Sequence, residues 1–460
     1  MHRLTRHVAG NISPRSAGTF DRSPAAAPAP PARQLAAESA FTRWSSVTSA
    51  GARLSLGTES GISLTVPEGA LAPGHTADMF VSVCHDTKSA PGPALQPGST
   101  LLSPVVVCGP AAASKKLRKP VIVSFPHCAA LRQGNWTLTV VGAGEGGEWR
   151  PLVTLGQETI NSAVYAQLDL NMLHLVTDSL SAFALVGSSA HAAPAYKSLR
   201  IAAFGAEVVP GGGELSVRLY CLQDTDHALR FVTETERQFG GRLLDAPVST
   251  LLQYGGHNLR LQLERLGEGW SVGAGAEVQE VPFPHLWGVS NPSLHCSFTL
   301  RPQAAPGVAG PRSLAMAVNI HQEGNTHKCL LKISTHISPH SAGSGGRGGQ
   351  QRPSSSGCSS SDSYSSAATF RLPAATKETL VRMLDAPVSL GNDWRLLAER
   401  LNVHRYIAFF ATRPSPTEAI LNLWEARNRE SSATAGLLNI LRGMGRFDAA
   451  HLLEHDLQLS

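Results

Sequence analysis

The stretch that most constrains the fold lies near the C-terminus and reads SPTEAILNLWEAR, residues 415–427. The Ser415 hydroxyl can accept a hydrogen bond from the Glu418 amide, while the Glu418 carboxylate can reach back to the cap amide. Pro416 suits the first helical position, where no donor is needed. Helical spacing then brings to one side three apolar residues edged by an arginine: Ile420, Leu423, Trp424 and Arg427. A helix of this kind needs a bundle to supply its core.

The flanking residues predict further short helices around the same core. They cover 377–384, a segment capped by Gly391-Asn392-Asp393 and running to 401, and then 405–411, 437–444 and 447–453. Together they predict an all-α bundle of six helices over residues 372–455. Its predicted core residues are Leu380, Trp394, Leu397, Phe409, Ile420, Leu423 and Trp424.

Four short sequence motifs inside this bundle are distinctive enough to indicate a family: GNDW, FFAT, SPT and LNLWEAR. In this order they resemble the death domain of the repulsive netrin receptors of the uncoordinated-five family. The resemblance implies a fold that associates with other death domains through charged faces, where complementary potentials select the partner. The predicted contact residues are the charges mostly off the apolar face: Asp393, Arg395, Glu399, Arg400 and Arg405. The alternative is that these charges form an ordinary solvated face.

Upstream of the bundle, the chain alternates between apolar and polar residues in short runs broken by Gly and Pro. This pattern extends over residues 41–188 and again over 195–338, and period-two alternation predicts antiparallel β-sandwiches. The predicted fold class is therefore multidomain, with two consecutive all-β sandwich domains followed by the all-α six-helix bundle. The basic run 115–119 between two strands is interpreted as a solvated loop, with contact to anionic lipid as the alternative.

Both β regions also contain distinctive sequence motifs. SGISLTVPEGAL, LLSPVVVCGP and PVIVSFPHCA resemble the ZU-five domain, which tight-junction scaffolds, netrin receptors and ankyrins share. VRLYCLQDTDHAL, EVPFPHLW and LHCSFTL resemble the UPA domain, which follows the ZU-five domain in several of these proteins. The order of the three domains resembles the cytoplasmic region of the netrin receptors.

Two segments are too poor in apolar residues to form a core. Residues 1–40 are Pro- and Ala-rich and are predicted to be disordered, with a mitochondrial transit peptide as the alternative. Residues 339–371 are rich in Ser and Gly and predict a flexible linker with a reach of roughly 30 Å. Such a tether implies an effective concentration on the order of millimolar between the bundle and the sandwiches. Even a weak contact between them would therefore hold the chain closed.

Composition limits the functions open to the chain. A net charge of +5 over 460 residues is mild and scattered, so nucleic-acid binding is not predicted. The seven cysteines occur without a C-x-x-C pair, which disfavours a zinc site and a disulfide framework and indicates a reducing compartment. No apolar run approaches the ~18 residues of a membrane span, so the chain as given is expected to be soluble and cytoplasmic.

In the family that the first sandwich resembles, one relative cuts its own chain at a His-Phe-Ser tripeptide in the last strand of this domain. The corresponding residues here read Ser179-Leu180-Ser181. Without an imidazole to take its proton, a hydroxyl is a weak nucleophile at neutral pH, so self-cleavage is disfavoured. His174 and Asp178 offer a base and a carboxylate without a matched nucleophile. We therefore predict no enzymatic activity, no catalytic residue, no cofactor and no metal site.

The resemblance implies the intracellular signalling portion of a netrin receptor, with roles in axon guidance, cell migration and apoptosis. It implies that the sandwiches fold against the death domain until signalling releases it, and that death-domain or adaptor proteins are the partners. Netrin itself would bind only through an ectodomain that this chain does not contain. As part of a full receptor, the chain would lie on the cytosolic side of the plasma membrane. The alternatives are an ankyrin-like membrane–cytoskeleton scaffold and a stand-alone death-domain adaptor.

Overall fold

The computed structural model describes residues 41–57, 60–84, 92–115, 117–144, 146–159, 161–162, 164–190, 193–206, 208–209, 213–288, 293–303, 313–339, 371–388, 390–428 and 432–459. The predicted N-terminal tail and all but the ends of the predicted linker lie outside these residues. The chain from Ala40 to Ser460 belongs to one unit.

The first sandwich consists of two antiparallel sheets. One has the strand order β1 (Thr42–Val47), β4 (Ala77–Cys84), β6 (Val105–Gly109), β12 (Ala182–Ser189), β8 (Trp136–Ala143) and β9 (Trp149–Thr154), with β5 (Ser99–Leu101) pairing β12. The other has the order β10 (Tyr165–Leu168), β11 (Met172–Thr177), β7 (Val121–Pro126), β3 (Ser63–Val66) and β2 (Ala52–Ser55). A short helix, α2 (Ala111–Ser114), follows β6. Because side chains alternate along each strand, both sheets turn one apolar face inward, and Phe125 and Phe183 meet in the core.

The second sandwich repeats this two-sheet plan. One sheet has the order β16 (Gly241–Leu243), β13 (Tyr196–Ala206), β15 (Leu215–Gln223), β21 (His295–Pro302) and β19 (Trp270–Val272), with β17 (Val248–Gln253) pairing β13. The other has the order β20 (Val278–Val281), β18 (Leu259–Leu266), β22 (Ser313–Gln322) and β23 (Lys328–His336). Two short strands, β14 (Val208–Val209) and β24 (Ser338–Pro339), pair in parallel.

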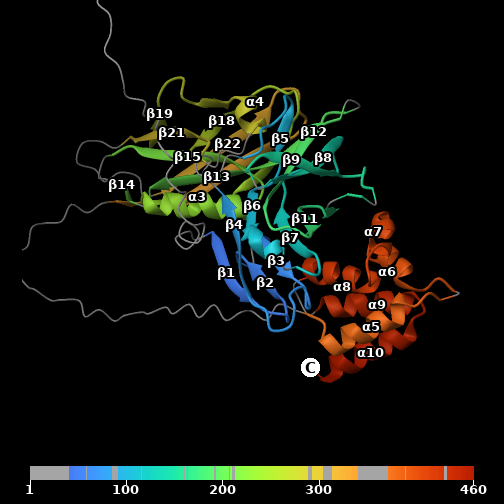
Figure 1. Cartoon of the computed structure of the whole chain (residues 1–460). Coiled ribbons are helices and arrows are strands. Elements are labelled where there is room, and N and C mark those ends of the chain that lie inside the picture. The colour runs from blue at the N-terminus through green and yellow to red at the C-terminus, as the bar shows by residue number, and fades with distance from the viewer. Residues whose placement is uncertain are drawn as a thin grey trace, which may run out of the picture. The chain divides into compact units, whose positions relative to one another are not determined.

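A helix that the alternation did not predict lies on the second sandwich. This helix, α3 (Asp226–Gln238), begins at Thr225, whose hydroxyl accepts from the Ala228 amide. Val232 packs with Phe204 and Tyr220 on the outer face of the β13–β15 sheet. A shorter helix, α4 (Phe283–Trp287), follows β20. The "all-β" description therefore holds for the two sheets but leaves out this covering helix (Figure 1).

The two sandwiches are joined through buried contacts. Lys197 of β13 is buried, and its ammonium donates to the Thr100 hydroxyl of the first sandwich (3.0 Å) and to the Leu286 carbonyl (2.9 Å). The Trp136 and Trp287 rings stack at 5.6 Å with 3° between their planes. These contacts hold the pair of sandwiches together as a platform.

The C-terminal region is the predicted helical bundle, drawn in orange and red in Figure 1. Its elements are α5 (Ala374–Asp385), α6 (Trp394–Arg400), the 3-10 turn η1 (His404–Tyr406) leading into α7 (Ile407–Ala411), α8 (Pro416–Arg427), α9 (Ala433–Gly443) and α10 (Phe447–Leu459). The side chains at its centre are at most 5% exposed: Leu380, Trp394, Leu397, Ile420, Leu423 and Trp424. The predicted fold class, two β-sandwich regions followed by a helical bundle, is confirmed.

We expect Trp424→Ala to destabilise the bundle by about 3–5 kcal/mol, because it removes a large buried side chain and leaves a cavity. Urea unfolding followed by the helical circular-dichroism signal measures this loss. Arg400→Ala, at an exposed position on α6, is the matched control and should change the free energy of unfolding by less than about 0.5 kcal/mol. Equal losses in the two variants would contradict the assignment of Trp424 to the core.

Candidate interaction site between the first sandwich and the bundle

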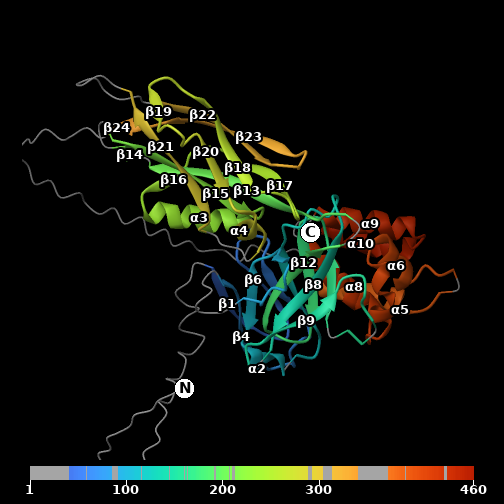
Figure 2. The same ribbon diagram turned by 90° about the horizontal axis from the view of Figure 1, so that it is seen from above.

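The helix α8 lies against the β10–β11–β7–β3–β2 sheet of the first sandwich (Figure 1). Figure 2 shows the bundle beside the same sandwich from above. Three residues on this sheet, Ile122, Tyr165 and Val176, belong to the same apolar cluster as the centre of the bundle. They occupy one row across β7, β11 and β10, since Ile122 pairs with Val176 and Val176 with Tyr165. We call this contact the docking interface.

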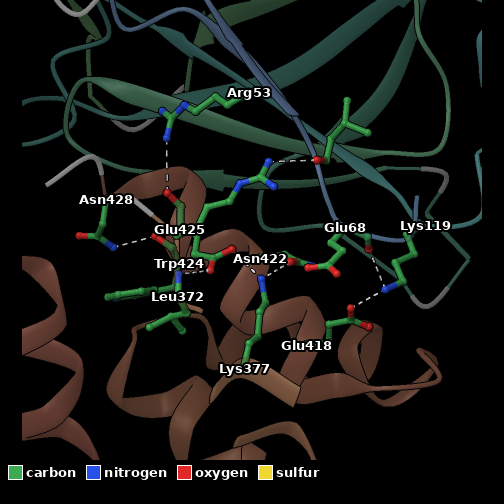
Figure 3. Close-up of polar contacts among 12 residues, drawn as sticks. Arg53, Glu68, Lys119, Leu372, Lys377, Glu418, Asn422, Trp424, Glu425 and Asn428 are labelled. Carbon is green, nitrogen blue, oxygen red and sulfur yellow. Dashed lines mark hydrogen bonds and ion pairs between the residues drawn. The ribbon is translucent and has the colours of Figure 1, made fainter. Parts of the chain in front are cut away.

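At its N-terminus, α8 is held by an ion pair with the first sandwich. The Glu418 amide donates to the Ser415 hydroxyl at 3.1 Å, as the cap pattern predicted. The Glu418 carboxylate, expected to reach back to the cap amide, instead lies against the Lys119 ammonium (Figure 3). That ammonium also donates to the Glu68 carbonyl at 2.9 Å. Lys119 ends the basic run interpreted as a solvated loop, so that interpretation is corrected for this residue.

At its C-terminus, α8 is held by an arginine of the first sandwich. Arg53 of β2 donates to the carbonyls of Ala426 (3.2 Å) and Glu425 (3.4 Å), as Figure 3 shows in part. The last carbonyls of a helix have no partner inside the helix and carry a partial negative charge, which a guanidinium stabilises. Strand β2 thus places a positive charge at the negative end of the helix dipole, where it is stabilising.

A bidentate ion pair completes the C-terminal contact. Arg427 donates through Nη2 to Asp169 Oδ1 (2.9 Å) and through Nε to Asp169 Oδ2 (3.1 Å), while Nη1 donates to the Leu401 carbonyl (3.1 Å). Two parallel bonds from a planar guanidinium to a carboxylate give direction as well as attraction. The sequence pattern placed Arg427 only at the edge of the apolar face and did not identify this role.

Two histidines hold Asp169 in position. His174 Nε2 lies 3.4 Å from Asp169 Oδ2, its Nδ1 lies 2.8 Å from the Ser124 hydroxyl, and His127 Nε2 lies 2.9 Å from the Asp169 carbonyl. Burial lowers the pKa of His174, so the ring is neutral at pH 7, with Nε2–H donating to Asp169 and Nδ1 accepting from Ser124. Burial alone would raise the pKa of Asp169, but the His174 hydrogen bond and the Arg427 charge lower it to about 2.

The residue types of a hydrolase triad occur here in Ser124, His174 and Asp169. Their surroundings instead suit a structural role, in which the other two side chains hold the Asp169 carboxylate in position. Ser124 is fully buried in β7 and is paired with β3 on one side and β11 on the other. An oxyanion hole needs free amide donors, and strand pairing occupies them here. The sequence pattern paired His174 with the nearby Asp178 and missed this cluster, because Ser124 lies 50 positions before His174 in the chain.

The serines considered for self-cleavage have other partners. The Ser179 hydroxyl lies 3.2 Å from the Thr177 hydroxyl, and the Ser181 hydroxyl donates to the Ala143 carbonyl. Among the described residues there is no cluster of three or more His, Cys, Asp or Glu side chains arranged to hold a metal ion.

Next to α8, an aromatic face of the bundle meets the sandwich. The Tyr406 hydroxyl donates to the Ala166 carbonyl at 2.8 Å. The Tyr165 ring meets Tyr406 edge-on at 3.8 Å and stacks on Phe409 at 4.9 Å. Phe409, predicted to be bundle core, is only half-buried and belongs to the docking interface. The fully buried aromatic residue of α7 is Phe410, one position further along.

The predicted contact residues divide into three groups. Asp393 is 3% exposed and caps α6 by accepting from the Arg395 amide at 2.9 Å, which corrects its assignment to the interaction surface. Its carboxylate is needed by the helix start. Arg395, Glu399 and Arg400 are exposed on α6. Arg405 lies at the docking interface, with Nη2 3.9 Å from Glu158 Oε2.

The chain is attached to the sandwich where it enters the bundle. Arg371 donates to the carbonyls of Ala50 (2.9 Å) and Val66 (3.4 Å), and the Leu372 amide donates to the Glu425 carboxylate (2.9 Å). Beside these bonds is a polar-lined cavity of about 30 Å³, a volume that suits roughly one water molecule. The docking interface therefore begins at Arg371, the last residue of the predicted linker, so the prediction of a flexible linker is corrected for this residue.

The fold and this interface define a class of protein: a β-sandwich pair that presents a helical interaction domain. Comparison with known families specifies it further. A ZU5 domain matches residues 43–143, a UPA domain matches 195–338, and a Death domain matches 377–457. This order matches the cytoplasmic architecture of the uncoordinated-five and ankyrin-like proteins. The chain is accordingly a signalling module that acts through protein interactions.

In the part of the chain that the structure describes, no helix is both long enough and apolar enough to cross a bilayer.

A double-mutant cycle tests the bidentate pair. We expect Asp169→Asn and Arg427→Gln each to weaken docking, and their coupling energy to be about 1–3 kcal/mol, because both remove the same charged hydrogen bonds. Urea unfolding of the full chain measures docking, since a docked bundle is stabilised by the free energy of the contact. Strict additivity of the two losses would show that the residues act independently.

Docking should also depend on pH. Burial lowers the pKa of His174, with Arg427 of the bundle adding to the effect, so the docked state favours the neutral ring. After release the pKa returns toward about 6.5, so docking is strongest above that pH and weakens below it. Asp169, whose pKa is about 2, stays ionised throughout this window. We expect the radius of gyration from small-angle scattering to rise between about pH 7.5 and about pH 5.5.

The control for this pH dependence is His174→Gln, which removes the titrating ring. It should flatten most of the response. An unchanged pH profile in this variant would assign the titration to another group.

Proposed function

We propose that the chain is the intracellular signalling module of a netrin receptor of the uncoordinated-five family, with roles in axon guidance, cell migration and apoptosis. In this proposal the Death domain is kept inactive by docking on the ZU5 domain and signals when it is released. Its partners are then other death-domain or adaptor proteins, bound partly through the exposed α6 residues Arg395, Glu399 and Arg400. We propose no catalytic step and no cofactor.

The observation that carries this proposal is that the ZU5 domain contacts α8 at both ends. Glu418 is paired with Lys119 at the N-terminus, and Arg53 and Asp169 engage the C-terminus. The aromatic face of η1 and α7 is covered in the same contact. A partner that needs these surfaces has to displace the ZU5 domain first.

The docking interface also buries polar atoms that would gain hydrogen bonds to water if the bundle were released. Ser63 Oγ, Thr65 Oγ1 and the Tyr165 hydroxyl are buried without a hydrogen-bond partner among the described residues. Thr65 and Ile122 pair across β3 and β7, which places them on the docked face of the sheet. A buried polar atom without a partner costs about 1–3 kcal/mol, and water would satisfy it once the bundle leaves. These atoms make the docked state less stable than it would be if the interface were packed like an ordinary domain core.

In this proposal the expected linker, residues 339–371, sets the strength that the docking contact needs. At an effective concentration on the order of millimolar, a contact with a Kd of about 1 mM between separate domains would be half closed. Each further 1.4 kcal/mol would shift the closed-to-open ratio about tenfold. A partner therefore opens the chain if its differential affinity for the open state exceeds a few kcal/mol.

An ankyrin-like scaffold is the second candidate, and the buried joint between the sandwiches favours it. Lys197 and the stacked Trp136 and Trp287 make the two sandwiches a rigid platform that needs no bundle. A scaffold would keep its main interactions when residues 372–460 are deleted, whereas the signalling module would lose them.

The variant Arg53→Glu/Lys119→Glu tests the proposal by reversing the two cations that hold α8. We expect the radius of gyration to rise and the pull-down of death-domain proteins to increase, because the bundle is released while its own residues are unchanged. Arg43→Glu/Arg132→Glu changes the same amount of charge at exposed positions on the same sandwich and should have neither effect. A released bundle that captures no additional protein would refute the signalling role.

A further inference from the structure

The docked face of the Death domain has the make-up of a ligand-binding surface. Three arginines surround its aromatic residues: Arg405 in η1, Arg413 after α7 and Arg427 at the end of α8. Between them the Tyr406, Phe409 and Phe410 rings meet Tyr165 of the ZU5 domain at 3.8, 4.9 and 5.8 Å. We call these six Death-domain residues the arginine–aromatic face.

The first sandwich fills this face with complementary side chains from one segment. Tyr165 supplies the aromatic ring, Asp169 the carboxylate for Arg427, and Glu158 the carboxylate beside Arg405. The three residues lie within residues 158–169, and the Tyr165 ring meets the aromatic face between the two acidic contacts. The chain therefore occupies its own binding surface with a short acidic segment that carries an aromatic residue.

One arginine of the face is left without an acid. Arg413 lies over the Phe409 ring at 4.1 Å, on which Tyr165 also stacks. Its Nε atom is buried and has no hydrogen-bond partner among the described residues. A buried donor of a charged group costs free energy until it meets an acceptor. The arginine–aromatic face could thus engage one more acceptor than the ZU5 segment supplies.

From these contacts we propose that the released Death domain binds a partner segment of the same chemistry: an aromatic side chain flanked by carboxylates. Building on the proposed function, this specifies the partner that the docking interface excludes. The aromatic ring takes the position of Tyr165, one carboxylate binds Arg427 in bidentate form, and a second lies beside Arg405. A partner that also offers an acceptor to Arg413 gains an interaction that the ZU5 domain lacks, which favours its binding over redocking.

The test uses the full chain with the ZU5 side of the interface altered and the arginine–aromatic face intact. Tyr165→Ala/Asp169→Asn removes the intramolecular ligand, and small-angle scattering reports whether the bundle is released. The probe is a fluorescein-labelled peptide of residues 157–170, followed by fluorescence anisotropy. We expect this variant to bind the peptide at least about tenfold more tightly than the unaltered chain, whose face is occupied.

Peptide and protein variants then locate the binding. A peptide carrying the change equivalent to Asp169→Asn should bind about tenfold more weakly, because it loses charged hydrogen bonds to Arg427. Phe409→Ala in the released chain should abolish most of the binding, and Arg405→Gln should weaken it. The matched control is Arg382→Gln, an exposed arginine of α5 outside this face. It should leave peptide binding unchanged.

The possible failures are distinguishable. If scattering shows that the altered chain stays closed, Tyr165 and Asp169 are not what holds the bundle and the inference is overturned, while the Arg53→Glu/Lys119→Glu variant tests the proposed function independently. If the bundle is released but the peptide does not bind, or binds equally well after Phe409→Ala and Arg405→Gln, the inference about the partner is overturned. In that case the release mechanism stands.

Discussion

The structure depends on the way one helix, α8, is held at both ends by charges from another domain. A helix has unsatisfied amides at its start and unsatisfied carbonyls at its end, and the ZU5 domain addresses each end with suitable side chains. Lys119 pairs with Glu418 of the first turn, and Arg53 donates to the last carbonyls. The bidentate pair between Asp169 and Arg427 adds direction. Since all these groups are polar, water can replace them when the domains separate.

Polar and apolar parts of the docking interface have different tasks. The Tyr165, Ile122 and Val176 side chains supply apolar area, while the buried polar atoms on the same sheet reduce its net benefit. The docking interface thus combines specific contacts with buried polar atoms that limit its stability, a balance that the proposed release of the Death domain requires. A core packed only with apolar side chains would hold the Death domain too firmly for a partner to compete.

Burial determines the role of the cluster formed by Ser124, His174 and Asp169. In an open cleft these residue types would suggest acyl transfer. Here the serine is part of a paired strand, the neutral imidazole transmits its orientation to the carboxylate, and the carboxylate binds an arginine of another domain. The cluster therefore supports the contact with Arg427, and the lowered pKa of its buried imidazole is the reason for the expected pH dependence of docking.

Sequence alone determined the features that depend on local periodicity and on helix ends. The cap at Ser415 and the core positions Trp394, Leu397 and Trp424 follow from helical spacing, and the strands follow from alternation, because each is set by neighbours a few residues away. The sequence pattern did not predict the α3 helix, because the alternating runs on both sides of it favoured strands. Its Thr225 cap was the available signal.

Only the tertiary structure decided what the charged and aromatic residues do. Glu418 could serve its own helix or Lys119, Asp393 could face a partner or cap α6, and Phe409 could enter the core or contact another domain. The choices for Glu418 and Phe409 depend on residues that are distant in the chain, whereas Asp393 accepts from an amide only two positions away. The partners of Asp169 show the same, because they come from segments up to 258 positions away and meet only when two domains are placed together.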